Sequence, residues 1–99
     1  MSYVITDPEA LTAAADSLAG ICAALDAQNA ATAGPTTSLV PAANDEISAL
    51  TAAIFSAHGQ LYQQVSSQAV AIFGSCVHDL STGARSYAST EGANAMAMS

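Results

Sequence analysis

Large apolar residues recur every three or four positions along two stretches of this chain, and the short segment between those stretches holds two of the three prolines. That spacing puts the apolar side chains on one face of an α-helix. In the first stretch the face is marked by Leu11, Leu18 and Leu25. Asp7 is a suitable N-cap, and Pro8 is a suitable first helical residue. The pattern therefore predicts an all-α chain built from two helices.

The boundaries of the two helices are predicted from residues that start or stop helices. Gly34 and Pro35 are expected to end the first helix, Pro41 lies near the start of the second, and Gly83 is a plausible terminator. Together these signals predict a hairpin domain over 1–83, with helix 1 over about 8–33, a turn over 34–40 and helix 2 over about 41–82, followed by a flexible tail over 84–99.

The second helix is predicted to carry a wide apolar face. One row runs through Ile47, Ile54 and Ile72, and a neighbouring row runs through Phe55 and Phe73. At a helical spacing of 100° per residue the rows cover an arc of about 140°, which is wider than the seam that one partner helix covers. The opposite face is expected to point into solvent and consists of Ser56, Gln60, Gln63, Ser67 and Gly74.

The unequal lengths of the two helices predict an apolar overhang. If the chain folds back near residue 37, Pro8 lies opposite residue 66, and side chains such as Phe73 and Leu80 project beyond the first helix. A patch of several large side chains left in water marks an interaction surface. We therefore expect the hairpin to complete a four-helix bundle with a helical partner.

The predicted partner interface lies on the apolar faces of both helices. A homodimer or homotetramer that buries the same faces is the alternative, either as a structural or as a membrane-associated module. The interface residues are Leu11, Leu18, Leu25, Ile47, Ile54, Phe55, Tyr62, Val65, Ile72, Phe73, Val77 and Leu80.

The charge of the chain limits its partners. The net charge is −7, and Arg85 is the only lysine or arginine, so the groups that hold nucleic-acid phosphates are lacking. No apolar run is expected to be long enough to span a bilayer, and no direct membrane insertion is expected. The N-terminal residues have no basic region followed by an apolar segment, so we expect no cleaved signal peptide.

The sequence offers no set of side chains suited to catalysis, to cofactor binding or to metal binding, and we expect a protein that is not an enzyme. His58 falls within the apolar arc, where an interface histidine is the simplest interpretation, and His78 falls on the polar face. Cys22 and Cys76 lack metal-ligand spacing and are predicted to lie too far apart for an intramolecular disulfide. The sequence leaves open whether Cys22 or Cys76 forms an intermolecular disulfide.

Several blocks of this sequence resemble the mycobacterial PE family, and the resemblance covers the whole chain. The blocks, in order, are Met1 to Leu11 with the pair Pro8-Glu9, Ala27 to Ala31, Pro35 to Thr37, Pro41 to Leu50 and Thr82 to Glu91. The resemblance implies two antiparallel helices that form a heterodimer with a PPE protein. The two cysteines depart from the family pattern.

The resemblance also implies export through a type VII secretion system. The family signal is a tyrosine, three residues and then an acidic residue after the second helix, and Tyr87 and Glu91 match it. Tyr3 and Asp7 fit the same spacing at the wrong end of the chain. The resemblance therefore implies cytoplasmic assembly with the PPE protein, with any cytosolic chaperone acting through that partner, and then secretion or display at the cell surface.

Overall fold

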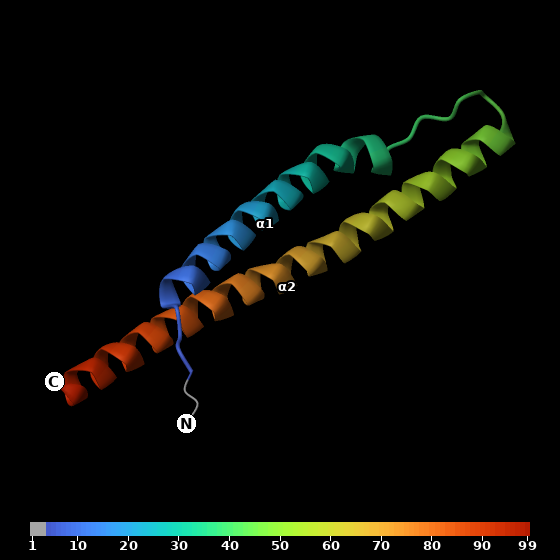
Figure 1. The fold of residues 1–99 in the computed structure, drawn as a ribbon. Coiled ribbons are helices and arrows are strands. Elements are labelled where there is room, and N and C mark those ends of the chain that lie inside the picture. Colours follow the sequence, from blue (N-terminus) through green and yellow to red (C-terminus); the bar gives the residue numbers. More distant parts are fainter. Residues whose placement is uncertain (1–3) are drawn as a thin grey trace. The chain divides into compact units, whose positions relative to one another are not determined.

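The computed structural model describes residues 4–99, and these form two long helices, α1 over Pro8–Thr37 and α2 over Glu46–Met98 (Figure 1). The prediction of an all-α chain with two helices is confirmed. Asp7 is the N-cap of α1, because its Oδ1 atom accepts a hydrogen bond of 3.0 Å from the backbone N–H of Ala10. Tyr3 lies outside the described residues.

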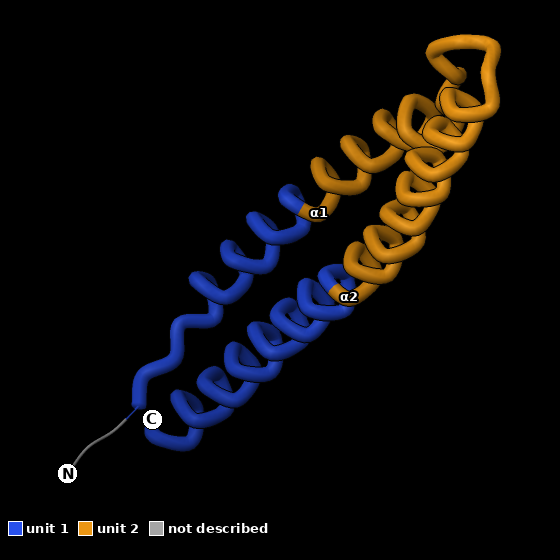
Figure 2. Tube along the Cα trace, turned by 90° about the vertical axis from the view of Figure 1, so that its right-hand side faces the viewer, with its two compact units in different colours: residues 1–21, 73–99 blue, residues 22–72 orange. Residues whose placement is uncertain are grey.

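The chain divides into two compact units, and each takes one part of α1 and one part of α2 (Figure 2). Unit 1 contains residues 1–21 and 73–99, and unit 2 contains residues 22–72. Within each unit the two helical segments run antiparallel. Unit 2 also contains the connection 38–45, which has no regular helix.

The predicted end of helix 1 at Ala33 is wrong, because α1 continues to Thr37 with Pro35 inside its last turn. Pro35 has no backbone N–H, and two threonine hydroxyls make additional hydrogen bonds to carbonyl groups one turn earlier. Thr36 donates to the carbonyl oxygen of Thr32 at 2.6 Å, and Thr37 donates to that of Ala33 at 2.6 Å. These side-chain bonds join the turn that contains Pro35 to the preceding turn.

The predicted bounds of helix 2 are also wrong at both ends. The helix begins at Glu46 rather than near Pro41, because Asp45 is its N-cap and accepts a bond of 2.8 Å from the backbone N–H of Ser48. It runs through Gly83 to Met98, so residues 84–98 are helical and not an irregular tail. A terminating glycine adopts a left-handed conformation, and none of the glycines among residues 4–99 has a positive φ.

The predicted register of the two helices is wrong by about 20 residues of α2, since residue 84 or 88 rather than residue 66 lies near Pro8. In unit 1, Pro8 lines a hollow with Ala84 and Ala88 instead of facing residue 66. In unit 2, the backbone N–H of Leu39 donates to Ser56 Oγ at 3.2 Å. The connection therefore already runs beside α2 before the chain turns back at residue 46, and the overhang inferred from a tight turn at residue 37 does not exist.

The core within each unit is made of small residues. Ala15 and Ala84, which are 1% and 2% exposed, are the buried apolar side chains of unit 1 among the described residues. Leu11, Leu18 and Leu80 are half-buried there. Small side chains let two helices approach closely, but they bury little apolar area.

One helix is long and apolar enough to cross a membrane by length and composition, which corrects the expectation of no such segment. It is α1, with a mean hydropathy of 1.3 over an 18-residue window. Its alanines supply this apolar character over almost the whole length of the helix. The core helix of a soluble protein can meet the same two criteria, but only 6% of this window is buried within the chain.

Candidate partner-binding surface

The face of α2 that packs against α1 in unit 2 is the small and polar one. Gly59 lies against the backbone of Thr36, and Gln63 Nε2 donates to the backbone carbonyl of Asn29 at 3.0 Å. The expectation that this face points into solvent is therefore wrong for Ser56 and Gln63. The half-buried or buried residues of α2 in unit 2 are Ser48, Ala52, Ser56, Gly59, Gln63, Ser66, Ala69 and Val70.

The large apolar residues of α2 lie on the exposed side of unit 2. Ile47 is 79% exposed and Ile72 is 69% exposed. We call this exposed set the apolar row, and it consists of Ile47, Leu50, Ile54, Phe55, Leu61, Tyr62, Val65 and Ile72. Most of its members follow one another at three, four or seven residues over 26 positions, and Phe55 and Tyr62 directly follow Ile54 and Leu61.

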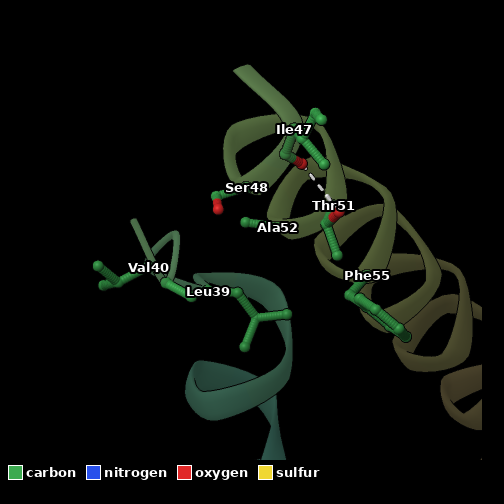
Figure 3. Close-up of a pocket in the computed structure, with 8 residues that line it drawn as sticks. Leu39, Val40, Ile47, Ser48, Thr51, Ala52 and Phe55 are labelled. Atoms are coloured by element: carbon green, nitrogen blue, oxygen red, sulfur yellow. Dashed lines mark hydrogen bonds between the residues drawn. The ribbon is translucent and has the colours of Figure 1, made fainter. Parts of the chain in front are cut away.

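An apolar hollow adjoins the start of the apolar row. Leu39 and Val40 of the connection and Ile47 and Phe55 of α2 line a cavity of about 250 Å³ (Figure 3). The hydroxyl of Thr51, on the same wall, donates to the carbonyl oxygen of Ile47 at 2.8 Å and so does not need a partner from outside. The hollow extends the apolar surface from the helix onto the connection.

The remaining residues of the predicted interface belong to the helix seams or to unit 1. Leu25 in unit 2 is half-buried, and so are Leu11, Leu18, Val77 and Leu80 in unit 1. Phe73, at 41% exposed, is intermediate between the two groups. The predicted leucines of α1 therefore pack against α2 within the chain, whereas the predicted residues of the apolar row face solvent.

The predicted signal residues Tyr87 and Glu91 lie in unit 1, one turn apart on α2. Because residues 84–98 are helical, the two side chains share a face of that helix. Both are exposed, and Glu91 Oε1 accepts a hydrogen bond of 3.2 Å from the hydroxyl of Thr6. This contact between the two ends of the chain had no signal in the sequence.

A buried asparagine joins the helices of unit 2, and sequence reasoning missed it. Asn29 is 6% exposed, and its Oδ1 accepts a bond of 2.8 Å from the hydroxyl of Tyr62. Its backbone carbonyl also accepts from Thr32 Oγ1 at 3.2 Å. Its Nδ2 has no hydrogen-bond partner among the described residues. An asparagine in an alanine-rich stretch gives no sign of burial without the register.

The titratable side chains do not assemble into a metal site among residues 4–99. No group of three or more His, Cys, Asp and Glu residues there is placed to hold a metal ion. His58 and His78 are both exposed. Cys22 and Cys76 are free thiols in different units, the first half-buried and the second exposed.

Two antiparallel helix pairs with small cores and a long row of exposed apolar side chains define an all-helical hairpin. The chain belongs to the mycobacterial PE family, whose model matches residues 4–94. It is 56% identical to the PE family protein PE13 of Mycobacterium tuberculosis strain H37Rv, and the match covers all of both chains.

Longer proteins from that organism also contain a region similar to this chain. PE family protein PE8 is 53% identical over 98% of this chain, which spans 35% of that protein. The PE-PGRS family protein PE_PGRS33 is 50% identical over 96% of this chain, which spans 20% of that protein. The names of these relatives state no enzymatic activity, and the resemblance noted in the sequence is confirmed.

Proposed function

We propose that this chain is a non-enzymatic PE protein that forms an obligate heterodimer with a PPE-family protein. The observation that carries the proposal is the apolar row of α2, which stays in solvent after α1 has packed against the opposite face. Burial of one large apolar side chain contributes about 1.5–3 kcal/mol, so the row forgoes much stabilisation while it is exposed. A partner that covers it recovers that free energy.

The geometry of the apolar row favours a helical partner. Its residues recur at helical spacing along one α-helix, which is the arrangement that a second helix covers by interdigitating side chains. Two helices from a PPE protein would complete a four-helix bundle. A homo-oligomer of this chain would bury the same row, and the stoichiometry of the purified complex distinguishes the two assemblies.

We further propose that Tyr87 and Glu91 form the signal by which a type VII secretion system exports the complex. Support comes from their exposure on one turn of α2 and from their place in unit 1, away in sequence from the apolar row. Membership of the PE family supports the same assignment. The complex would assemble in the cytoplasm and reach the cell surface or the medium.

The experiment compares export and pairing in the same cells. Wild type, Tyr87→Ala and Glu91→Ala are co-expressed with the PPE partner, and the ratio of secreted to cell-associated protein is measured beside co-purification. We expect both variants to pair at wild-type yield and to stay inside the cell. Asp7→Asn serves as the control and should be exported. Normal export of Tyr87→Ala, or its loss only through failed pairing, would contradict the signal assignment.

A membrane-associated role is the second candidate, and the length and hydropathy of α1 favour it. Against insertion, α1 carries Asp16 and Asp26, and a bilayer-spanning segment of about 20 residues within α1 would contain at least one of them. Flotation of the purified heterodimer with neutral vesicles tests this candidate. We expect the heterodimer to remain in the soluble fraction, and co-flotation would favour the membrane role.

A further inference from the structure

We propose that Asn29 fixes the register of α1 against α2 in unit 2 and thereby determines which side chains the chain presents to a partner. The register needs a specific device because the seam of α2 is almost uniform. Its residues are small or polar over more than five turns, from Ser48 to Ser66. Such a surface packs nearly as well after a slip of seven residues, which is close to two full turns and keeps the same face toward α1.

Hydrogen bonds to Asn29 distinguish the observed register from the two registers that are shifted by seven residues. In the observed register Asn29 meets Tyr62 and Gln63, and both donate to it. A slip of seven residues in one direction would replace this pair by Phe55 and Ser56, and a slip in the other direction would replace it by Ala69 and Val70. With Phe55 and Ser56 in place, the phenolic donor of Tyr62 is lost. With Ala69 and Val70 in place, neither side chain could bond to the buried amide.

The unpartnered Nδ2 atom of Asn29 supports a role in specificity rather than in stability. Among the described residues this buried donor has no acceptor, which costs free energy that an apolar side chain would not cost. A buried asparagine that selects one register at some cost in stability is known from coiled coils. The structure assigns the same role to Asn29 in this helix pair.

Gly59 excludes the same slips by steric contact, as a second and independent device. A Cβ atom at this position would overlap the carbonyl oxygen of Thr36. Slips of seven residues would bring Ala52 or Ser66 to the place of Gly59, and both carry a Cβ. The helices could then not approach as closely, so the polar contacts of Asn29 and the close approach at Gly59 specify one register together.

The register decides what reaches the partner surface. Tyr62 belongs to the apolar row and donates to Asn29, so its ring is held where the seam meets the exposed face. In a slipped register Phe55 or Ala69 would take that place. The link to partner selection rests on the proposed pairing function, whereas the register itself is a property of unit 2 alone.

The test traps the register with engineered disulfides in the full chain co-expressed with its PPE partner. Cys22→Ser and Cys76→Ser remove the native thiols. Leu39→Cys with Ser56→Cys reports the observed register, and Leu39→Cys with Ala49→Cys reports a slip of seven residues. We expect the first pair to crosslink in the parent and the second to give only background.

Asn29→Leu is then compared with Gln28→Leu, an equivalent change at the exposed neighbouring position. We expect Asn29→Leu to shift the ratio of the two crosslinks toward the slipped pair by at least about fivefold, which corresponds to one lost hydrogen bond. Partner yield should fall with it, and Gln28→Leu should change neither. Tyr62→Phe removes only the hydroxyl, keeps the ring, and should shift the ratio in the same direction.

Separate outcomes distinguish the register from the pairing function. An unchanged crosslink ratio in both Asn29→Leu and Tyr62→Phe would overturn the role of Asn29, whatever the partner yield. A shifted ratio with full partner yield would confirm the register and contradict its link to partner selection. Failure of the parent chain to co-purify with any PPE protein would contradict the proposed function and leave the crosslink ratio measurable.

Discussion

The two units use the same architecture, an antiparallel pair of helical segments, but they distribute their large side chains differently. In unit 1, Val77 and Leu80 of α2 are half-buried around the small residues Ala15 and Ala84. In unit 2 the seam is small and polar, and the apolar row lies in solvent. The comparison indicates that apolar content alone does not locate a binding surface. What matters is which face of the helix the intrachain partner has already covered.

The largest effect is expected from a charge placed in the apolar row. Ile72→Asp should abolish co-purification with the PPE partner, because an unpaired carboxylate in an apolar interface costs several kcal/mol. The matched control is Gln60→Asp on another side of the same helix, which is exposed. Gln63→Asp is not a suitable control, since Gln63 bonds to Asn29. Equal pairing by both variants would show that the partner does not cover the row.

The next largest effect is expected from adding a methyl group to a glycine of α2, and we compare one glycine from each unit. Gly59→Ala should destabilise the complex by about 1–3 kcal/mol, because the new methyl group overlaps the backbone of Thr36. Gly74→Ala meets no atom within 4 Å and should stabilise its helix by about 0.5–1 kcal/mol. Thermal unfolding of the heterodimer followed by circular dichroism measures both. A stabilising Gly59→Ala would contradict the close approach in unit 2.

A smaller effect is expected at the contact between the chain ends in unit 1. Thr6→Ala removes the bond to Glu91 and should lower the secreted fraction by about twofold, since one exposed hydrogen bond contributes little. Thr6→Ser keeps the hydroxyl and should be exported as wild type. Thr12→Ala is the control, because Thr12 bonds only to its own helix at Pro8. Pairing should be unchanged in all three variants.

The smallest effect concerns the N-cap of α2. The backbone N–H of Ser48, and then its hydroxyl, lower the pKa of Asp45 below its ordinary value of 3.8. The cap therefore contributes its full stabilisation above that value and loses it as the pH falls through the lower folded-state pKa. The loss of this cap should lower the melting temperature of the heterodimer slightly as the pH falls below about 4. Asp45→Asn, which keeps the capping oxygen, should make that fall slightly shallower.

The sequence predicted the helices well where the signals were local. The N-cap Asp7 and the helical spacing of the apolar residues depend on neighbours within one or two turns, and both predictions are confirmed. Pro35 and Gly83 were misread because their effects depend on context. The turn that contains Pro35 stays helical and is joined to the preceding turn by two threonine hydroxyls, and Gly83 keeps a helical conformation.

The register and the orientation of α2 could not be predicted from the same signals. Both follow from the path of residues 38–45, which lack a turn with a defined sequence signature. The hydrophobic rule then led to the wrong assignment of faces, since it places large residues inward and small polar residues outward. In unit 2, Gly59 and Gln63 contact α1 and Ser56 contacts the connection, which leaves the large residues exposed.

Site-specific photo-crosslinking in the co-expressed heterodimer tests the central claim most directly, because it reports where the partner lies without altering charge. A photoreactive residue at Val65, within the apolar row, should form a covalent adduct with the PPE protein, and the same residue at Gln60 should not. Adducts from Val65 alone are the predicted result. Adducts from Gln60 alone, or none from Val65 while the two proteins still co-purify, would contradict the account.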